Sequence, residues 1–137
     1  MRSYSAFSLA LFCTLTGAVA WSQVKQGKSR PLATKTWMKT VNGPHCSALA
    51  KMMKAGPADE GEWQSAAVHA QMLAESGYVL MADGRCPDAI WAEASKTLQD
   101  ASAEMAKAVE AKNTADAQAA MGKILGSCKS CHAAHKK

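Results

Sequence analysis

Apolar residues recur at three- and four-residue intervals over most of the chain after residue 30, which is the spacing of an amphipathic α-helix. The pattern predicts four helices, over about residues 31–55, 59–81, 90–112 and 114–132. No stretch alternates between apolar and polar residues with a period of two, so we expect no strands. Four helices joined by short loops predict an all-α fold, an antiparallel four-helix bundle.

The first predicted helix carries a stripe of apolar or ligand-capable side chains at helical spacing. Its members are Met38, Val41, His45, Ala48, Leu49 and Met52. Gly43 and Pro44 interrupt the stripe, and proline removes one backbone donor and clashes with the carbonyl group four residues earlier. We therefore expect the helix to be kinked at this point or to restart at Pro44.

The first 22 residues have the features of a secretory signal peptide. Arg2 gives a positive start, residues 6–20 are apolar, and Ala18 and Ala20 offer small residues for cleavage. The apolar run is shorter than the roughly 20 residues that span a bilayer. The sequence thus predicts a signal peptide at residues 1–22 and a domain at residues 23–137, exported to the periplasm without a membrane span after cleavage.

Composition narrows the class of partner. Only 6% of the chain is aromatic, so the helices should pack closely through small residues. The formal charge is +5, but the lysines are scattered, whereas binding to nucleic acid favours a concentrated basic stripe. We expect no nucleic-acid partner, and a mild basic surface suited to docking on an acidic redox protein.

The segment CKSCH near the end of the chain has the spacing of a c-type haem attachment site. Residues three and four apart share one helix face, so Cys128, Cys131 and His132 should point the same way. Each thiol can form a thioether with one haem vinyl group, and His132 can then bind the iron as its proximal ligand.

Two other interpretations of this segment are less well supported. A dithiol redox centre usually opens a helix, whereas Cys128 and Cys131 close one. A zinc site needs four ligands, and no second cysteine pair or histidine pair completes the set. The spacing therefore favours one haem c, covalently bound through Cys128 and Cys131.

A late CKSCHAAHK on the last helix of an exported four-helix bundle resembles the class II c-type cytochromes, which include cytochrome c-prime and its low-spin relatives. The resemblance implies a covalently bound haem, electron transfer, and a homodimer formed through the first two helices. Family members often have an aromatic residue three positions after the ligand histidine and a cation four after it. Here these positions hold His135 and Lys136, so the cation matches and the aromatic residue does not.

The sixth ligand of the iron decides between two functions. In relatives with a six-coordinate haem, a methionine on the first helix binds the iron just after a basic residue, and Met38 with Lys35 resembles that pattern. Met38 is therefore the candidate distal ligand for an electron carrier, with His45, seven residues later, as the alternative. If neither residue binds, the resemblance to cytochrome c-prime implies an open distal site that takes a small gas such as NO or CO.

Two further expectations concern the rest of the domain. Exported proteins favour disulfides, and the sequence predicts one between Cys46 and Cys86, the two cysteines of residues 23–137 that lie outside the haem motif. We expect no enzymatic activity, because no distal histidine and arginine pair with recognisable spacing stands out.

Overall fold

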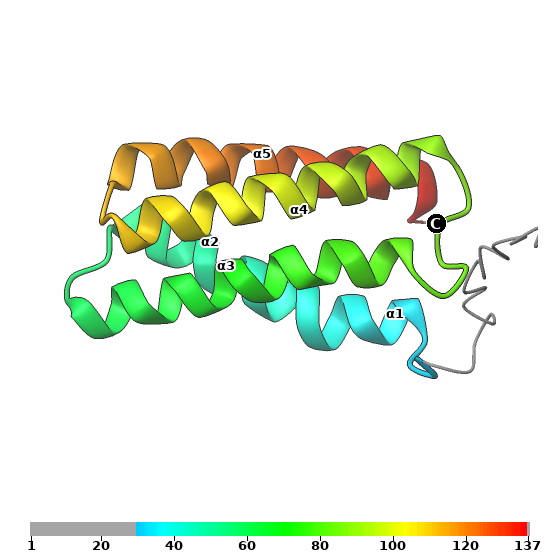
Figure 1. Cartoon of the computed structure of the whole chain (residues 1–137), viewed down its shortest axis with the longest axis horizontal. Coiled ribbons are helices and arrows are strands. Elements are labelled where there is room, and N and C mark those ends of the chain that lie inside the picture. The colour runs from blue at the N-terminus through cyan, green and yellow to red at the C-terminus, as the bar shows by residue number, and fades with distance from the viewer. Residues whose placement is uncertain (1–29, 137) are drawn as a thin grey trace, which may run out of the picture.

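The computed structural model describes residues 30–136, which form helices and no strand. The elements are α1 (Thr34–Trp37), η1 (Met38–Asn42), α2 (Gly43–Ala55), α3 (Glu60–Met81), α4 (Ala89–Glu110) and α5 (Thr114–His135). The first three elements follow one another without a break, so the described residues form four helical rods. Figure 1 shows that successive rods run in opposite directions, which confirms the predicted antiparallel four-helix bundle.

Side-chain caps set where the last three rods begin. Asp59, Asp88 and Asn113 each accept a hydrogen bond from the backbone N–H three residues later, at 2.9, 2.9 and 3.2 Å. Such a bond satisfies one of the N–H groups that a helix start leaves without an intrahelical partner. At the other end of α2, Gly56 has a φ of 77°, a conformation that glycine adopts without steric cost.

The first rod contains one turn of π-helix directly before Pro44. The Gly43 N–H donates to the carbonyl of Met38, five residues earlier, instead of the usual four. Pro44 has no N–H to donate, and the widened turn lets the helix continue past it with a change of register. The predicted interruption is therefore a π-turn, and two turns of this rod need about eight residues rather than seven.

Small residues let the rods approach closely, as the composition predicted. The closest contact of this kind joins α3 to α4 at Gly77, where an added Cβ would lie 2.8 Å from the backbone oxygen of Ser95. The most deeply buried large side chains lie between the rods: Leu49, Leu73, Met105, Val109 and Ile124. Trp91 is also buried and donates from its indole nitrogen to the Leu80 carbonyl at 2.8 Å.

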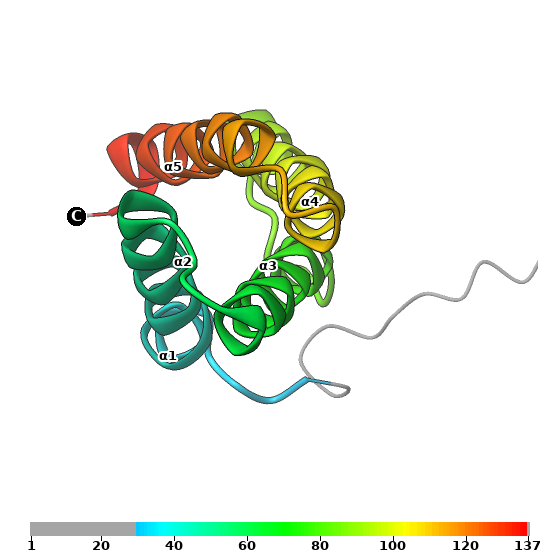
Figure 2. The same cartoon turned by 90° about the vertical axis from the view of Figure 1, so that its left-hand side faces the viewer.

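Viewed along the bundle, the rods form a ring in which α5 lies between α4 and α2 (Figure 2). Packing is most extensive between α3 and α4 and between α4 and α5, and it is sparse between α2 and α5. Among residues 30–136, no helix is long and apolar enough to cross a membrane. The predicted signal peptide at residues 1–22 lies outside the described residues.

Candidate haem site

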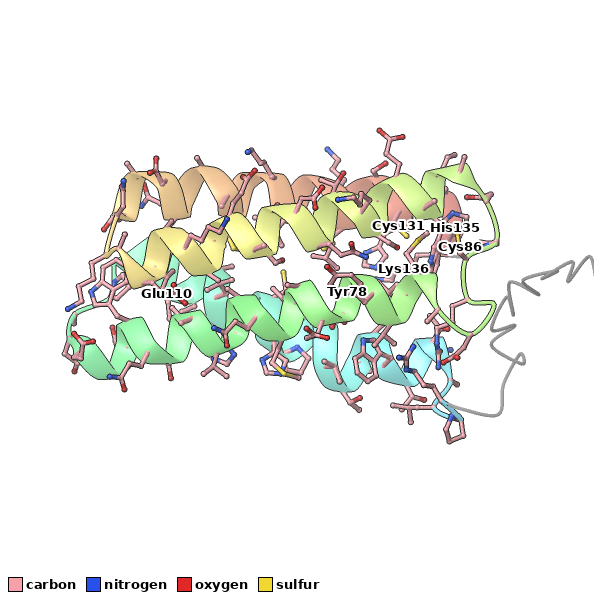
Figure 3. The ribbon with its side chains drawn as sticks, viewed as in Figure 1. Tyr78, Cys86, Glu110, Cys131, His135 and Lys136 are labelled. Carbon is pink, nitrogen blue, oxygen red and sulfur yellow. The ribbon has the colours of Figure 1, made fainter. Side chains whose placement is uncertain are left out.

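Cys128, Cys131 and His132 of the CKSCH segment lie on α5 and line one cavity. Cys131 is buried with 7% of its surface exposed, Cys128 is half-buried, and His132 is exposed at the rim. The helix is continuous through this segment, so residues three and four apart share a face. Figure 3 shows Cys131 on α5 toward the end of the bundle where His135 and Lys136 lie.

The opposite wall of the cavity comes from the first rod. Met38 and Asn42 lie on η1, and Cys46 lies one turn further along on α2; all three line the cavity. Met38, the candidate distal ligand, therefore lines the same cavity as Cys128, Cys131 and His132. Asn42 is 91% buried, and its side-chain oxygen has no hydrogen-bond partner within residues 30–136.

The remaining walls are mostly apolar and come from α3 and α4. Leu80, Ala94 and Leu98 contribute side chains, and Ser95 and Ser127 add small polar ones. The cavity has a volume of about 190 Å³ and is open on one side. α2 and α5 make few contacts with each other, whereas α3 packs extensively against α4.

Two cysteines from different rods, Cys46 on α2 and Cys128 on α5, line this cavity. The Cys46 thiol lowers the pKa of Cys128 to about 7, against the opposing effect of burial. Cys128, together with burial, raises the pKa of Cys46. Burial and then the negative charges of Cys128 and Asp88 raise the pKa of Cys131.

His45 does not line the cavity, although the sequence offered it as the alternative to Met38. Its Nδ1 lies 2.7 Å from the Nδ1 of His69 on α3, with the ring centroids 5.0 Å apart. The π-turn accounts for this, because the extra residue in that turn brings Cys46 rather than His45 under Met38. Burial, followed by the proximity of His45, lowers the pKa of His69.

The predicted disulfide between Cys46 and Cys86 is not present. Both residues are free thiols, and they contact different parts of the molecule. Cys46 lines the same cavity as Cys128, whereas Cys86 lies before α4 and its thiol donates to the Asp88 carbonyl at 3.5 Å. The shift of register at the π-turn directs Cys46 inward to the cavity, a change that helical spacing alone did not predict.

His135 lies three positions after His132, at the end of α5. Its ring packs edge-on against Trp91, with the centroids 5.3 Å apart, and its Nε2 lies 3.4 Å from an Asp88 carboxylate oxygen. The imidazole therefore packs against the core as an aromatic ring would. Lys136 follows the helix and is exposed, so its side chain can reach solvent near the cavity rim.

Within the described part of the chain, no three His, Cys, Asp or Glu side chains are arranged to hold a metal ion. A haem iron needs only axial ligands from the protein, because the ring supplies the other four. His132 and Met38, the candidate axial ligands, and the thiols of Cys128 and Cys131 all line the same cavity.

Sequence analysis missed two cavity residues, Asn42 and Cys46. Both lie at helical spacing from Met38 once the π-turn is counted, and Pro44 was the signal that the register changes there.

No protein-family model, curated protein or solved structure matches this chain. The fold itself defines the class of protein: an all-helical bundle with a cavity lined by its first and last rods.

Proposed function

We propose that this protein is an exported monohaem c-type cytochrome of the class II kind, which carries electrons in the periplasm. One haem would be held by thioethers to Cys128 and Cys131, with His132 as the proximal ligand. The observation that supports this most is the presence of these three residues and Met38 around a single, mostly apolar cavity.

When bound, the haem supplies one-electron chemistry by cycling between ferric and ferrous iron. The residues of the chain would set the conditions for that cycling. Leu80 and Leu98 give the cavity an apolar lining, and a low-polarity environment of this kind is one of the factors that tune a haem potential. A Met38 thioether on the distal side would favour the reduced state and raise the potential.

The test of this function begins with protein produced in a host that matures c-type cytochromes. We expect the wild type and Cys86→Ser to gain the mass of one haem, and we expect this added mass to survive denaturation. The double variant Cys128→Ser/Cys131→Ser should not gain this mass. We also expect a low-spin spectrum of the reduced protein that does not change with CO. A spectrum that shifts with CO would refute the electron-carrier assignment.

A second function, binding of NO or CO at a vacant distal position, is supported by one observation. The buried Asn42 side chain lines the cavity one turn from Met38, and its oxygen lacks a partner within residues 30–136. A buried acceptor without a donor is costly; an ordered water in the cavity would satisfy it, and the NH2 group of the same side chain could then donate to bound NO or CO. In that case the reduced protein binds CO, and Asn42→Leu changes the CO dissociation rate while Asn113→Ser does not.

The export signal, the covalent attachment and the mild basic charge together favour a periplasmic location and an acidic redox partner. Partner binding of this type weakens as salt screens the charges. We expect the rate of electron exchange with an acidic redox protein to fall between 10 mM and 500 mM salt. A rate independent of salt would contradict an electrostatic docking surface.

A further inference from the structure

Two histidines outside the cavity face each other between α2 and α3. The Nδ1 atoms of His45 and His69 lie 2.7 Å apart, and the ring centroids are 5.0 Å apart with the ring planes inclined at 58°. Neither residue lines the cavity of the candidate haem site. The pair joins two rods that pack side by side (Figure 2), and the proposed electron carrier gives it no role.

The short distance fixes where the hydrogens of the neutral pair lie. One Nδ1 carries a hydrogen and donates it, and the other Nδ1 accepts with its lone pair. The accepting ring therefore has its own hydrogen on Nε2, whereas the Nε2 of the donating ring is bare. If the shared hydrogen leaves, both Nδ1 atoms have a lone pair available at the same place, which is what a metal ion bound by two histidines requires.

The spacing suits a metal ion that holds its ligands at right angles. Imidazole nitrogens bind a divalent ion such as zinc at about 2.0–2.1 Å, so two nitrogens at a right angle on one ion lie about 2.9 Å apart, and at the tetrahedral angle about 3.3 Å apart. The observed 2.7 Å is nearer to the right-angle value. Tetragonal sites with nitrogen and oxygen ligands are typical of Cu²⁺ and Ni²⁺. The χ2 torsion of histidine is broad, so each ring can turn its lone pair toward such an ion.

We propose that His45 and His69 form a two-histidine site for a divalent ion of the Cu²⁺ and Ni²⁺ class, which binds both Nδ1 atoms and takes water at its other positions. Both side chains are half-buried, so the pair is within reach of solvent. Among residues 30–136, no group of three metal-ligating side chains of the His, Cys, Asp and Glu types could hold an ion. Two protein ligands completed by water are therefore what this part of the chain offers.

Binding needs no loss of a proton from the neutral pair. The ion takes the place of the shared hydrogen, and a hydrogen appears on the Nε2 of the ring that donated. Each ring then carries one hydrogen, on Nε2, and both remain neutral. The bound ion holds α2 to α3 at a point away from the cavity, so the site does not depend on the proposed haem.

NMR of the ring nitrogens tests the site directly, because each histidine is observed separately. The full chain is labelled with ¹⁵N in its four histidines and titrated with Ni²⁺ at pH 7.5. Ni²⁺ is the probe because thiols reduce Cu²⁺. Before metal is added, one ring of the pair should carry its hydrogen on Nδ1 and the other on Nε2. Ni²⁺ should then broaden the signals of His45 and His69 together, before those of His132 and His135.

The variants His45→Gln and His69→Gln each remove one ligand and leave a side chain of similar size that can still donate and accept hydrogen bonds. Loss of even an outer-shell partner typically costs 10–100-fold in metal affinity. In each variant, the remaining ring should therefore need at least about tenfold more Ni²⁺ for the same broadening. Far-UV circular dichroism checks that both variants stay helical.

The double variant Cys46→Ser/Cys128→Ser is the control for binding of Ni²⁺ to thiols at the cavity, and it should respond as the wild type does. His45 signals that broaden equally in His69→Gln, or a response that disappears in the cysteine variant, would place the ion elsewhere and overturn the proposal. In the wild type itself, signals of His45 and His69 that stay sharp while other histidines respond, or that do not respond at all, would show that the pair is a hydrogen bond only.

Discussion

Gly77 fixes how closely α3 approaches α4, and Gly77→Ala should lower the stability of the whole bundle. An added Cβ would lie 2.3 Å from Cγ of Gln99, 2.8 Å from the backbone oxygen of Ser95 and 3.1 Å from the backbone nitrogen of Gln99. The Gln99 side chain can rotate away, but the two backbone atoms move only if the helices separate. Overpacking of this kind costs about 1–3 kcal/mol, and it would also displace Ser95 from the cavity wall.

Gly122→Ala is the matched control, because Gly122 is also inside a helix and its added Cβ meets nothing within 4 Å. Both substitutions gain the same helix propensity, about 1 kcal/mol, so the difference between the two variants isolates the packing cost. We expect Gly122→Ala to be more stable than Gly77→Ala by about 1–3 kcal/mol in urea unfolding followed by far-UV circular dichroism. Equal stabilities would refute the close helix approach.

Three further substitutions test other parts of the molecule. Met38→Ala should convert a low-spin haem to a high-spin haem that binds CO, and an unchanged optical spectrum would exclude Met38 as the distal ligand. Burial and the proximity of His45 lower the pKa of His69 in the folded state, so the unfolded chain takes up the proton first as the pH falls. The free energy of unfolding should therefore decrease as the pH drops below about 6.5. Urea unfolding between pH 5 and 8 should show a weaker pH dependence in His69→Gln than in the wild type, and an equal pH dependence would contradict this prediction. Trp91→Phe removes the 2.8 Å hydrogen bond to the Leu80 carbonyl and should cost about 1–3 kcal/mol in thermal or urea unfolding, whereas a neutral effect would show that this bond is not needed.

The helix boundaries were largely predictable because local signals set them. Asp59 and Asn113 stand at the predicted helix starts and serve as caps in the structure, and Gly56 ends α2 as expected. The common face of Cys128 and Cys131 follows from their spacing alone. These features depend on residues within one turn of each other, which is the range over which sequence patterns are informative.

The distal wall was less predictable, because one backbone feature changes which side chains share a face. A stripe based on ordinary helical spacing put His45 under Met38, and the π-turn before Pro44 brings Asn42 and Cys46 there instead. The predicted pairing of Cys46 with Cys86 was wrong for the same reason. Proline signals an interruption, but whether the chain kinks, restarts or widens by one residue depends on packing against the neighbouring rods.

The central claim is that the cavity between the first and last rods holds a covalently attached haem. The most direct measurement is the intact mass of denatured protein from a host that matures such cytochromes, compared with the same protein carrying Cys128→Ser/Cys131→Ser. Our account predicts the added mass of one haem in the first sample and none in the second. A wild-type mass equal to that of the polypeptide alone would contradict it.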